Sequence, residues 1–246
     1  MKKDRDEILF GDTRIEYSII RRPTRTTTAI TVHPDRTIEV VAPKGTRKKA
    51  IAPFVRSRAT WIIKQQVHFA RLHVPKEKAF VNGESFQYLG RQYQFKMLPI
   101  APAGSKPQVS LRAGKFFVEV PKRWSVIKRK EAAKEALISW YREHAKERIA
   151  ERAAYFSKQL GIETPKTFVR DQQKRWGSCN KKGELRFNWR IVMAPMLLVD
   201  YVVAHELCHL FFYDHSTEFW SLLRKIMPDY EKRRRLLEKT GVRYRF

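Results

Sequence analysis

The C-terminal third of the chain contains histidines and a glutamate with the spacing of a metal-dependent hydrolase site. Residues 204–209 read Ala-His-Glu-Leu-Cys-His, and His215 follows six residues later. Residues four apart in a helix lie on the same face, so His205 and His209 could hold one metal ion together. Glu206 is rotated by about 100° from His205 and could lie beside that ion without ligating it. His-Glu-x-x-His is the pattern of zinc sites in which the glutamate is the general base.

His215 can be a third ligand only if the helix ends before it. The chain could reverse at Tyr213 and Asp214, because aspartate tolerates the left-handed backbone conformation that such reversals often need. The preceding run 196–203 is apolar enough to form a buried helix that carries the site into the core. The alternative is a core helix whose histidines only pack or form hydrogen bonds.

The flanking segments predict a hairpin before this helix and two helices after it. Strands at 166–170 and 184–191 enclose the turn 180–183, and Pro195 is placed to open the metal-binding helix. Ser216 or Asp214 can cap a following helix. A last, basic helix is expected to end at Gly241.

The N-terminal half predicts strands followed by a helix, twice over. Strand patterns within 14–42 precede a helix over 46–72 that Thr46 can cap. Strand patterns at 86–95 and 109–120 precede a helix from 126 to 160, with Ser125 as its cap and Gly161 at its end. This is a possible duplicated strand-strand-helix unit, although two common arrangements could also coincide. A domain division is expected near 75–80 or near Gly161.

The overall charge is strongly positive, with 51 Lys and Arg against 25 Asp and Glu, a net of +26. Such a surface attracts polyanions, including nucleic acid and nucleotides, although solvated basic faces need no ligand. Cys179 and Cys208 form no Cys-x-x-Cys pair and no disulfide framework. We find no signal peptide and no apolar segment of membrane-spanning length, which favours a cytoplasmic protein without membrane contact.

Several motifs together resemble the YgjP-like metal-dependent hydrolases, which are predicted zinc metallopeptidases akin to the SprT-like and WLM proteases. They are Arg-Trp-Gly-Ser-Cys at 175–179, Asn-Trp at 188–189, the segment 200–209, Asp-His-Ser at 214–216, Phe-Trp at 219–220 and Pro-Asp-Tyr at 228–230. The resemblance extends over the full length of the chain, and its C-terminal third is the specific part. The glycine of the metzincin pattern is replaced here by Phe212, which argues against a metzincin proper.

The resemblance implies that His205, His209 and His215 are zinc ligands and that Glu206 is the catalytic carboxylate. It also implies an α+β fold with a zincin-like catalytic core, in which the metal-binding helix packs on a small antiparallel sheet or hairpin. We therefore expect an N-terminal strand and helix region at 1–78 and a zincin-like hydrolase region at 79–246, with the metal site at 205–215.

Three neutral imidazoles suit Zn²⁺ and leave one coordination position open, although other divalent transition metals also accept histidine. Tyr213 and Arg175 are candidates for stabilising the oxyanion, and each could instead be a packing residue or a surface charge. The strand next to the metal helix could pair with an extended peptide substrate.

Three functions are compatible with these residues. The first is a zinc metallopeptidase acting on a peptide or protein. The second is a metal-dependent nucleotide or phosphoanhydride hydrolase that uses the same site. The third is a basic, nucleic-acid-associated protein with a structural metal, for which Cys179 is the obvious fourth ligand. The sequence predicts no oligomeric state.

Overall fold

The computed structural model describes residues 4–33, 35–71, 78–100, 106–172 and 175–244. The chain forms two compact units, Met1–Pro75 and Lys76–Phe246, so Gly161 lies inside the second unit. Strands and helices are mixed in both units, which confirms the predicted α+β class. Two expectations fall partly outside the described residues. They are the end of the first helix at residue 72 and the part of the expected domain division at residues 75–77.

The first unit is one mixed sheet with two helices. Its strands are β1 (Asp4–Phe10), β2 (Thr13–Arg22), β3 (Ala29–Val32) and β4 (Ile38–Pro43), in the spatial order β1-β2-β4-β3. β2 and β4 run parallel, and the two outer pairs are antiparallel. The helices are α1 (Lys48–Ser57) and α2 (Ala59–Arg71). Apolar side chains from the sheet and both helices form a core of their own.

Two sequence expectations for this unit are wrong. The helix expected over 46–72 is two helices divided at Arg58, and α1 begins after Arg47 without a side-chain cap from Thr46. The strand β1 was not expected, because its first four residues are charged and Ile8 is its one buried residue. An edge strand needs few apolar residues, so its alternation is weak.

The second unit begins with a sheet of the same topology. Its strands are β5 (Ser85–Tyr88), β6 (Arg91–Ile100), β7 (Gln108–Arg112) and β8 (Lys115–Pro121), in the order β5-β6-β8-β7. β6 and β8 are parallel and the outer pairs antiparallel, as in the first sheet. The repeated order agrees with the predicted duplication, but the repeated piece contains four strands before the helical part.

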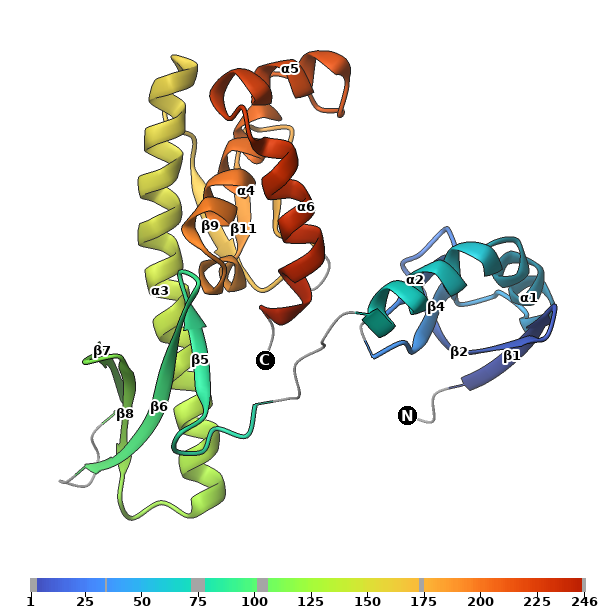
Figure 1. Ribbon diagram of the computed structural model, residues 1–246. Helices are drawn as coiled ribbons and strands as arrows, with labels where there is room; N and C mark the ends of the chain where they lie inside the picture. The colour runs from blue at the N-terminus through green and yellow to red at the C-terminus, as the bar shows by residue number, and fades with distance from the viewer. Residues whose placement is uncertain (1–3, 34, 72–77, 101–105, 173–174, 245–246) are drawn as a thin grey trace. The chain divides into compact units, whose positions relative to one another are not determined.

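The long helix α3 (Val126–Leu160) runs along the second unit and links its sheet to the helices that follow (Figure 1). Ser125 accepts a hydrogen bond from the N–H of Lys128, and Gly161 ends the helix at a φ of +68°, as the sequence predicted. Its buried face is a stripe of residues four apart, Ala133, Leu137, Tyr141, Ala145, Ile149 and Ala153. This stripe packs against the sheet at one end and against the following elements at the other.

A three-stranded sheet and three helices complete the unit. The strands are β9 (Thr167–Arg170), β10 (Gly177–Cys179) and β11 (Leu185–Asn188), in the order β10-β11-β9. The helices are α4 (Met196–Cys208), α5 (Thr217–Ile226) and α6 (Tyr230–Thr240). Short 3-10 turns, η1 (Trp189–Met193) and η2 (Gly241–Arg243), lie before α4 and after α6.

The expected hairpin between 166–170 and 184–191 needs correction. β9 is parallel to β11, and the antiparallel partner of β11 is the three-residue strand β10. Residues 189–193 are a 3-10 turn because the side chain of Asn188 accepts a hydrogen bond from the N–H of Arg190 and ends the strand. The helix α4, which carries His205 and His209, therefore follows a small mixed sheet.

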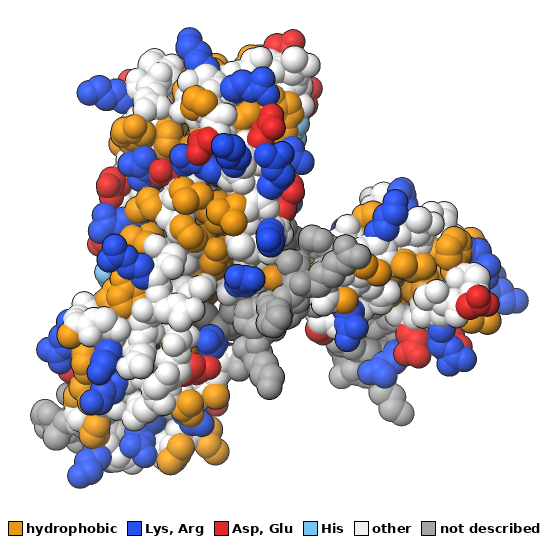
Figure 2. Space-filling model, viewed as in Figure 1, with side chains coloured by type: hydrophobic (Ala, Val, Ile, Leu, Met, Phe, Trp, Pro, Cys, Tyr) orange, Lys and Arg blue, Asp and Glu red, His pale blue; other side chains and the backbone are white. Residues whose placement is uncertain are grey.

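Two properties of the whole chain bear on its partners. No helix among the described residues is both long and apolar enough to cross a lipid bilayer. Lys and Arg side chains are scattered over both units on the face seen in Figure 2, among acidic and apolar groups, so this face carries no single basic stripe.

Candidate metal centre

The C-terminal end of α4 brings His205 and His209 to the start of a tight reversal of the chain. α4 ends at Cys208, and His209 is its C-cap residue. The N–H groups of Leu210 and Phe211 then bond back to carbonyls of the last helical turn. No residue from 210 to 214 has a positive φ, so the left-handed conformation expected at Asp214 is not used.

His215 lies immediately before α5, and the start of that helix fixes its position. The side chain of Ser216 caps α5 by accepting a hydrogen bond from the N–H of Phe219. Phe219 is fully buried and packs against all three histidine rings, with centroid distances of 4.6 to 5.0 Å. A buried aromatic ring thus forms the floor beneath the three imidazoles.

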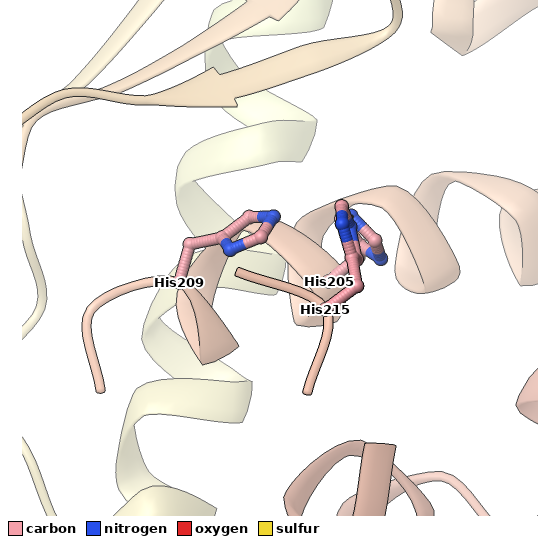
Figure 3. A group of neighbouring side chains, drawn as sticks. All are labelled: His205, His209 and His215. Carbon is pink, nitrogen blue, oxygen red and sulfur yellow. The ribbon is translucent and has the colours of Figure 1, made fainter. Parts of the chain in front are cut away.

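The three predicted ligands converge. One potential ligand atom of each histidine lies within 4.8 Å of those of the other two. The Nε2 atoms of His205 and His215 are 3.1 Å apart. Two nitrogens bound to one tetrahedral zinc at 2.0–2.1 Å are separated by about 3.3 Å, so this spacing fits such a site. Figure 3 shows the three rings gathered at the end of the helix.

The hydrogen bond of His209 selects which of its nitrogens can bind a metal. Its Nδ1 lies 2.9 Å from the carbonyl oxygen of Phe212. A proton on Nδ1 donates to this oxygen and leaves the lone pair of Nε2 for a metal, the arrangement common in metal-ligating histidines. The ring of His205 packs near Tyr201, and its Nδ1 is buried without a hydrogen-bond partner among the described residues.

The surroundings of His205 and His215 favour the neutral form of these two imidazoles. The pKa of His205 is lowered to about 3, first by burial and then by the neighbouring His209, His215 and Arg234. The pKa of His215 is also lowered, first by burial and then by His209 and Arg234. Metal binding requires neutral imidazole, so the site is prepared for a cation at neutral pH.

Glu206 is held in a buried position beside the histidines. It is 6% exposed, and its Oε2 has no hydrogen-bond partner among the described residues. Burial raises the pKa of Glu206 to about 8, and the charge of Arg175 opposes this shift. A carboxylate in this environment is a stronger base than one in water.

Gly177 in β10 makes room for Glu206. A Cβ atom at Gly177 would lie 2.6 Å from both Cγ and Oε1 of Glu206. The φ of Gly177 is not in the left-handed region, so the backbone alone would accept another residue. The backbone of β10 therefore approaches Glu206, the proposed base, closely.

The other candidates from the sequence occupy different positions. Arg175 is exposed and close enough to Glu206 for its charge to act on that carboxyl. Tyr213 is 68% exposed in the loop before His215. Cys179 is outside the group of converging ligand atoms, and burial and the charge of Glu206 raise its pKa. Cys208 is fully buried within α4 and packs in the core.

Sequence reasoning missed Arg234, which lies in the basic helix expected before Gly241. Its guanidinium carbon lies 5.3 Å from the ring centre of Trp220. Trp220 in turn stacks on His215, with ring centres 5.4 Å apart and planes inclined by 25°. The spacing of Tyr230 and Arg234, four apart on α6, would place both on one face, but nothing in the sequence shows that this face meets the histidines.

A family model described as "YgjP-like, metallopeptidase domain" matches residues 26–240. The chain belongs to the YgjP-like family. This YgjP-like protein is therefore a hydrolase of a metallopeptidase family, and membership implies a divalent metal ion. The predicted resemblance is confirmed.

Two further comparisons add little to the family assignment. Among solved structures, the YgjP-like chain is similar to the metallopeptidase zymogen abylysin of Pyrococcus abyssi, with 21% sequence identity and a TM-score of 0.35. That match covers 38% of this chain and 95% of the other. No curated protein matches the YgjP-like chain.

Proposed function

We propose that this protein is a zinc-dependent peptidase in which His205, His209 and His215 hold the metal and Glu206 activates water. The convergence of the three imidazoles within 4.8 Å is the observation that supports this proposal most strongly. Three imidazole nitrogen donors and no further residue in this group among the described residues match a catalytic zinc site with one open position.

Zinc, when bound, would lower the pKa of its water and polarise the scissile carbonyl. Glu206 would take the proton from the attacking water and later transfer it to the amine that leaves. Its buried position next to His205 supports both steps, because a general base must lie within hydrogen-bond reach of the water that the metal would hold. Gly177 would keep the carboxylate in place by leaving space for it.

A free strand edge next to the site supports a peptide as substrate. β10 pairs with β11 on one side and is the edge of its sheet, and it packs against α4. An extended peptide could add to this edge as a further strand, which would place a carbonyl group near the three histidines.

The proposal is tested by replacing Glu206 with Gln in zinc-loaded protein. We expect casein cleavage to fall by about a hundredfold or more, because a general base contributes 10²–10⁴ to the rate. Zinc content, measured by elemental analysis, should stay at one ion per chain. Glu218→Gln in α5 removes an exposed carboxylate and is the matched control. Unchanged turnover in Glu206→Gln would exclude this mechanism.

A nucleotide or phosphoanhydride hydrolase using the same site is the second candidate. The positive charge of Arg175 acts on Glu206, and that of Arg234 acts on His205 and His215. Two positive charges near the site favour an anionic substrate. Phosphate release from nucleoside triphosphates without casein cleavage would favour this function over the first. The structural-metal alternative gains no support, since Cys179 does not join the converging ligand atoms among the described residues.

We further propose that the protein works in a reducing compartment, the cytoplasm, because Cys179 and Cys208 are both unpaired. Contact with nucleic acid or another polyanion through the basic surface stays a prediction from the net charge of +26.

A further inference from the structure

A cavity of about 300 Å³ lies between α5 and α6, one aromatic ring away from the proposed metal site. Trp220 forms the boundary, because it stacks on His215 and also on Tyr230, whose ring centre is 5.3 Å away at 17°. The cavity is lined by Trp220, Tyr230, Glu231, Arg234, Arg235 and Glu238.

Arg234 offers unused hydrogen-bond donors in this cavity. Its Nε donates to Glu238 at 3.0 Å, whereas its two terminal amino groups have no hydrogen-bond partner among the described residues. The side chains of Arg234 and Glu238 are 50% and 58% exposed. Ion pairs this exposed are weak, so an incoming anion can compete for the guanidinium.

The cavity combines two features that suit a carboxylate carried on a short apolar stem. A guanidinium binds a carboxylate through two parallel hydrogen bonds. Trp220 and Tyr230 line the same cavity as the guanidinium and provide apolar surface for the methylene groups of a glutamate side chain. Trp220 contacts both Arg234 and His215, at 5.3 and 5.4 Å, so the guanidinium lies one aromatic ring away from the proposed metal site.

We propose that Arg234 and Trp220 form a subsite for an acidic side chain of the peptide substrate. The distance from Arg234 to Trp220 and the distance from Trp220 to His215 are each roughly 5 Å. Together they correspond to about three residues of an extended chain, so the acidic residue would lie two or three positions from the cleaved bond. This proposal rests on the proposed peptidase function, and it adds a substrate class: peptides with a carboxylate at a fixed distance from the scissile bond.

The experiment compares peptide pairs that differ only by Glu or Gln at one position on either side of the cleaved bond. We expect the zinc-loaded protein to prefer Glu by about tenfold in kcat/KM at one position, mainly through KM. Arg234→Gln should abolish this ratio, and Arg234→Glu should invert it in favour of a matched Lys peptide. Lys232→Gln removes an exposed charge from the same helix and should retain the ratio. Each pair is also made with a C-terminal acid or amide, so that a preference for the terminal carboxylate is recognised.

Two results would overturn the subsite and leave the peptidase proposal intact. One is equal cleavage of Glu and Gln peptides at every position, and the other is a Glu preference that persists in Arg234→Gln. If no peptide is cleaved at all, the peptidase proposal fails, and binding still tests the subsite. The same pairs titrated against zinc-loaded Glu206→Gln should differ about tenfold in Kd, and equal affinities would contradict the subsite.

Discussion

Gly177 and Glu206 illustrate how a residue without a side chain can determine the position of a reactive one. The strand β10 needs no glycine for its own conformation, because the φ of Gly177 is ordinary. The space that a side chain would fill at this position is taken by the carboxylate of Glu206. Gly177 is thus a positioning residue for the proposed base.

Gly177→Ala should displace the Glu206 carboxylate and lower kcat by at least about tenfold, with zinc content unchanged, because a general base must stay within hydrogen-bond reach of its proton. KM should change less than kcat, since the substrate-binding surfaces remain. Gly45→Ala is the matched control, because a Cβ added there meets no heavy atom within 4 Å and the φ is ordinary. A normal kcat in Gly177→Ala would show that the carboxylate does not need its present position.

The buried carboxyl of Glu206 also predicts a pH dependence of stability in metal-free protein. Its pKa is about 8 in the folded state, against 4.5 for the group in water, so the folded chain binds the extra proton between these values. The free energy of unfolding should therefore fall as pH rises from 5 to 8, by up to about 1.4 kcal/mol per pH unit.

Urea unfolding with a chelator, at pH 5, 6.5 and 8, compares wild type with Glu206→Gln, which lacks this group. The lowered pKa of His205 has the opposite effect, with stability lost as pH falls below 6.5, but it acts in both proteins and cancels in the difference. Parallel stability curves for the two proteins would contradict the predicted environment of Glu206.

The residues of the candidate site were predictable, and their surroundings were not. Positions 205, 206 and 209 follow from local helical periodicity, and His215 was a possible third ligand that the family resemblance then supported. Arg234 could not be found in this way, because its contact with Trp220 depends on how α5 and α6 pack. Such contacts join residues distant in sequence and leave no periodic signal.

At the scale of elements, α4 is fixed in the second unit by Asp200. Its carboxylate accepts a hydrogen bond from Nε of Arg152 in α3 at 2.5 Å and lies 3.8 Å from Nη1 of Arg233 in α6. Arg233 also donates to the carbonyl oxygen of Leu197 near the start of α4. The side chains of Asp200 and Arg152 are 15% and 19% exposed, so solvent screens this pair less than a surface pair.

Asp200→Ala should destabilise the protein by about 2 kcal/mol, because it leaves the partly buried guanidinium of Arg152 without its carboxylate, whereas Arg233 keeps its pair with Asp229. Urea unfolding of the metal-free protein measures this change. Glu143→Gln breaks a pair with Lys146 in which both side chains are 59% exposed, and it should change stability by less than about 0.5 kcal/mol. Equal effects of the two substitutions would show that Asp200 does not fix α4.

Helix ends were predictable where one residue provides the signal, and strand partners were not. Ser125, Gly161 and Ser216 mark helix ends as expected, because capping depends on neighbours in sequence. The pairing of β11 with both β9 and β10 depends on contacts across the sheet. A three-residue strand such as β10 is too short to show an alternating pattern.

At the scale of the whole molecule, each unit has its own apolar core. The core of the first unit is built from residues between Ile8 and Ile62, and that of the second from residues between Phe80 and Tyr244. The three histidines and Glu206 belong to the second unit, Lys76–Phe246. The repeated strand order of the two sheets was visible in the sequence as a weak duplication, since both copies have the same order of strand and helix patterns.

A fragment containing residues 76–246 should fold cooperatively and bind one zinc ion, because its core needs no residue of the first unit. Thermal unfolding by circular dichroism and zinc titration measure both properties. The fragment 1–75 is the matched control and should bind no zinc with comparable affinity. A disordered 76–246 fragment would show that the two units depend on each other for folding.

The central claim is that three imidazoles and no sulfur hold the metal ion. X-ray absorption spectroscopy at the zinc edge of the loaded, full-length protein tests it most directly. The structure predicts three imidazole nitrogens at about 2.0–2.1 Å and one further oxygen donor. A sulfur neighbour at about 2.3 Å, or fewer than three imidazoles, would contradict the proposed catalytic site.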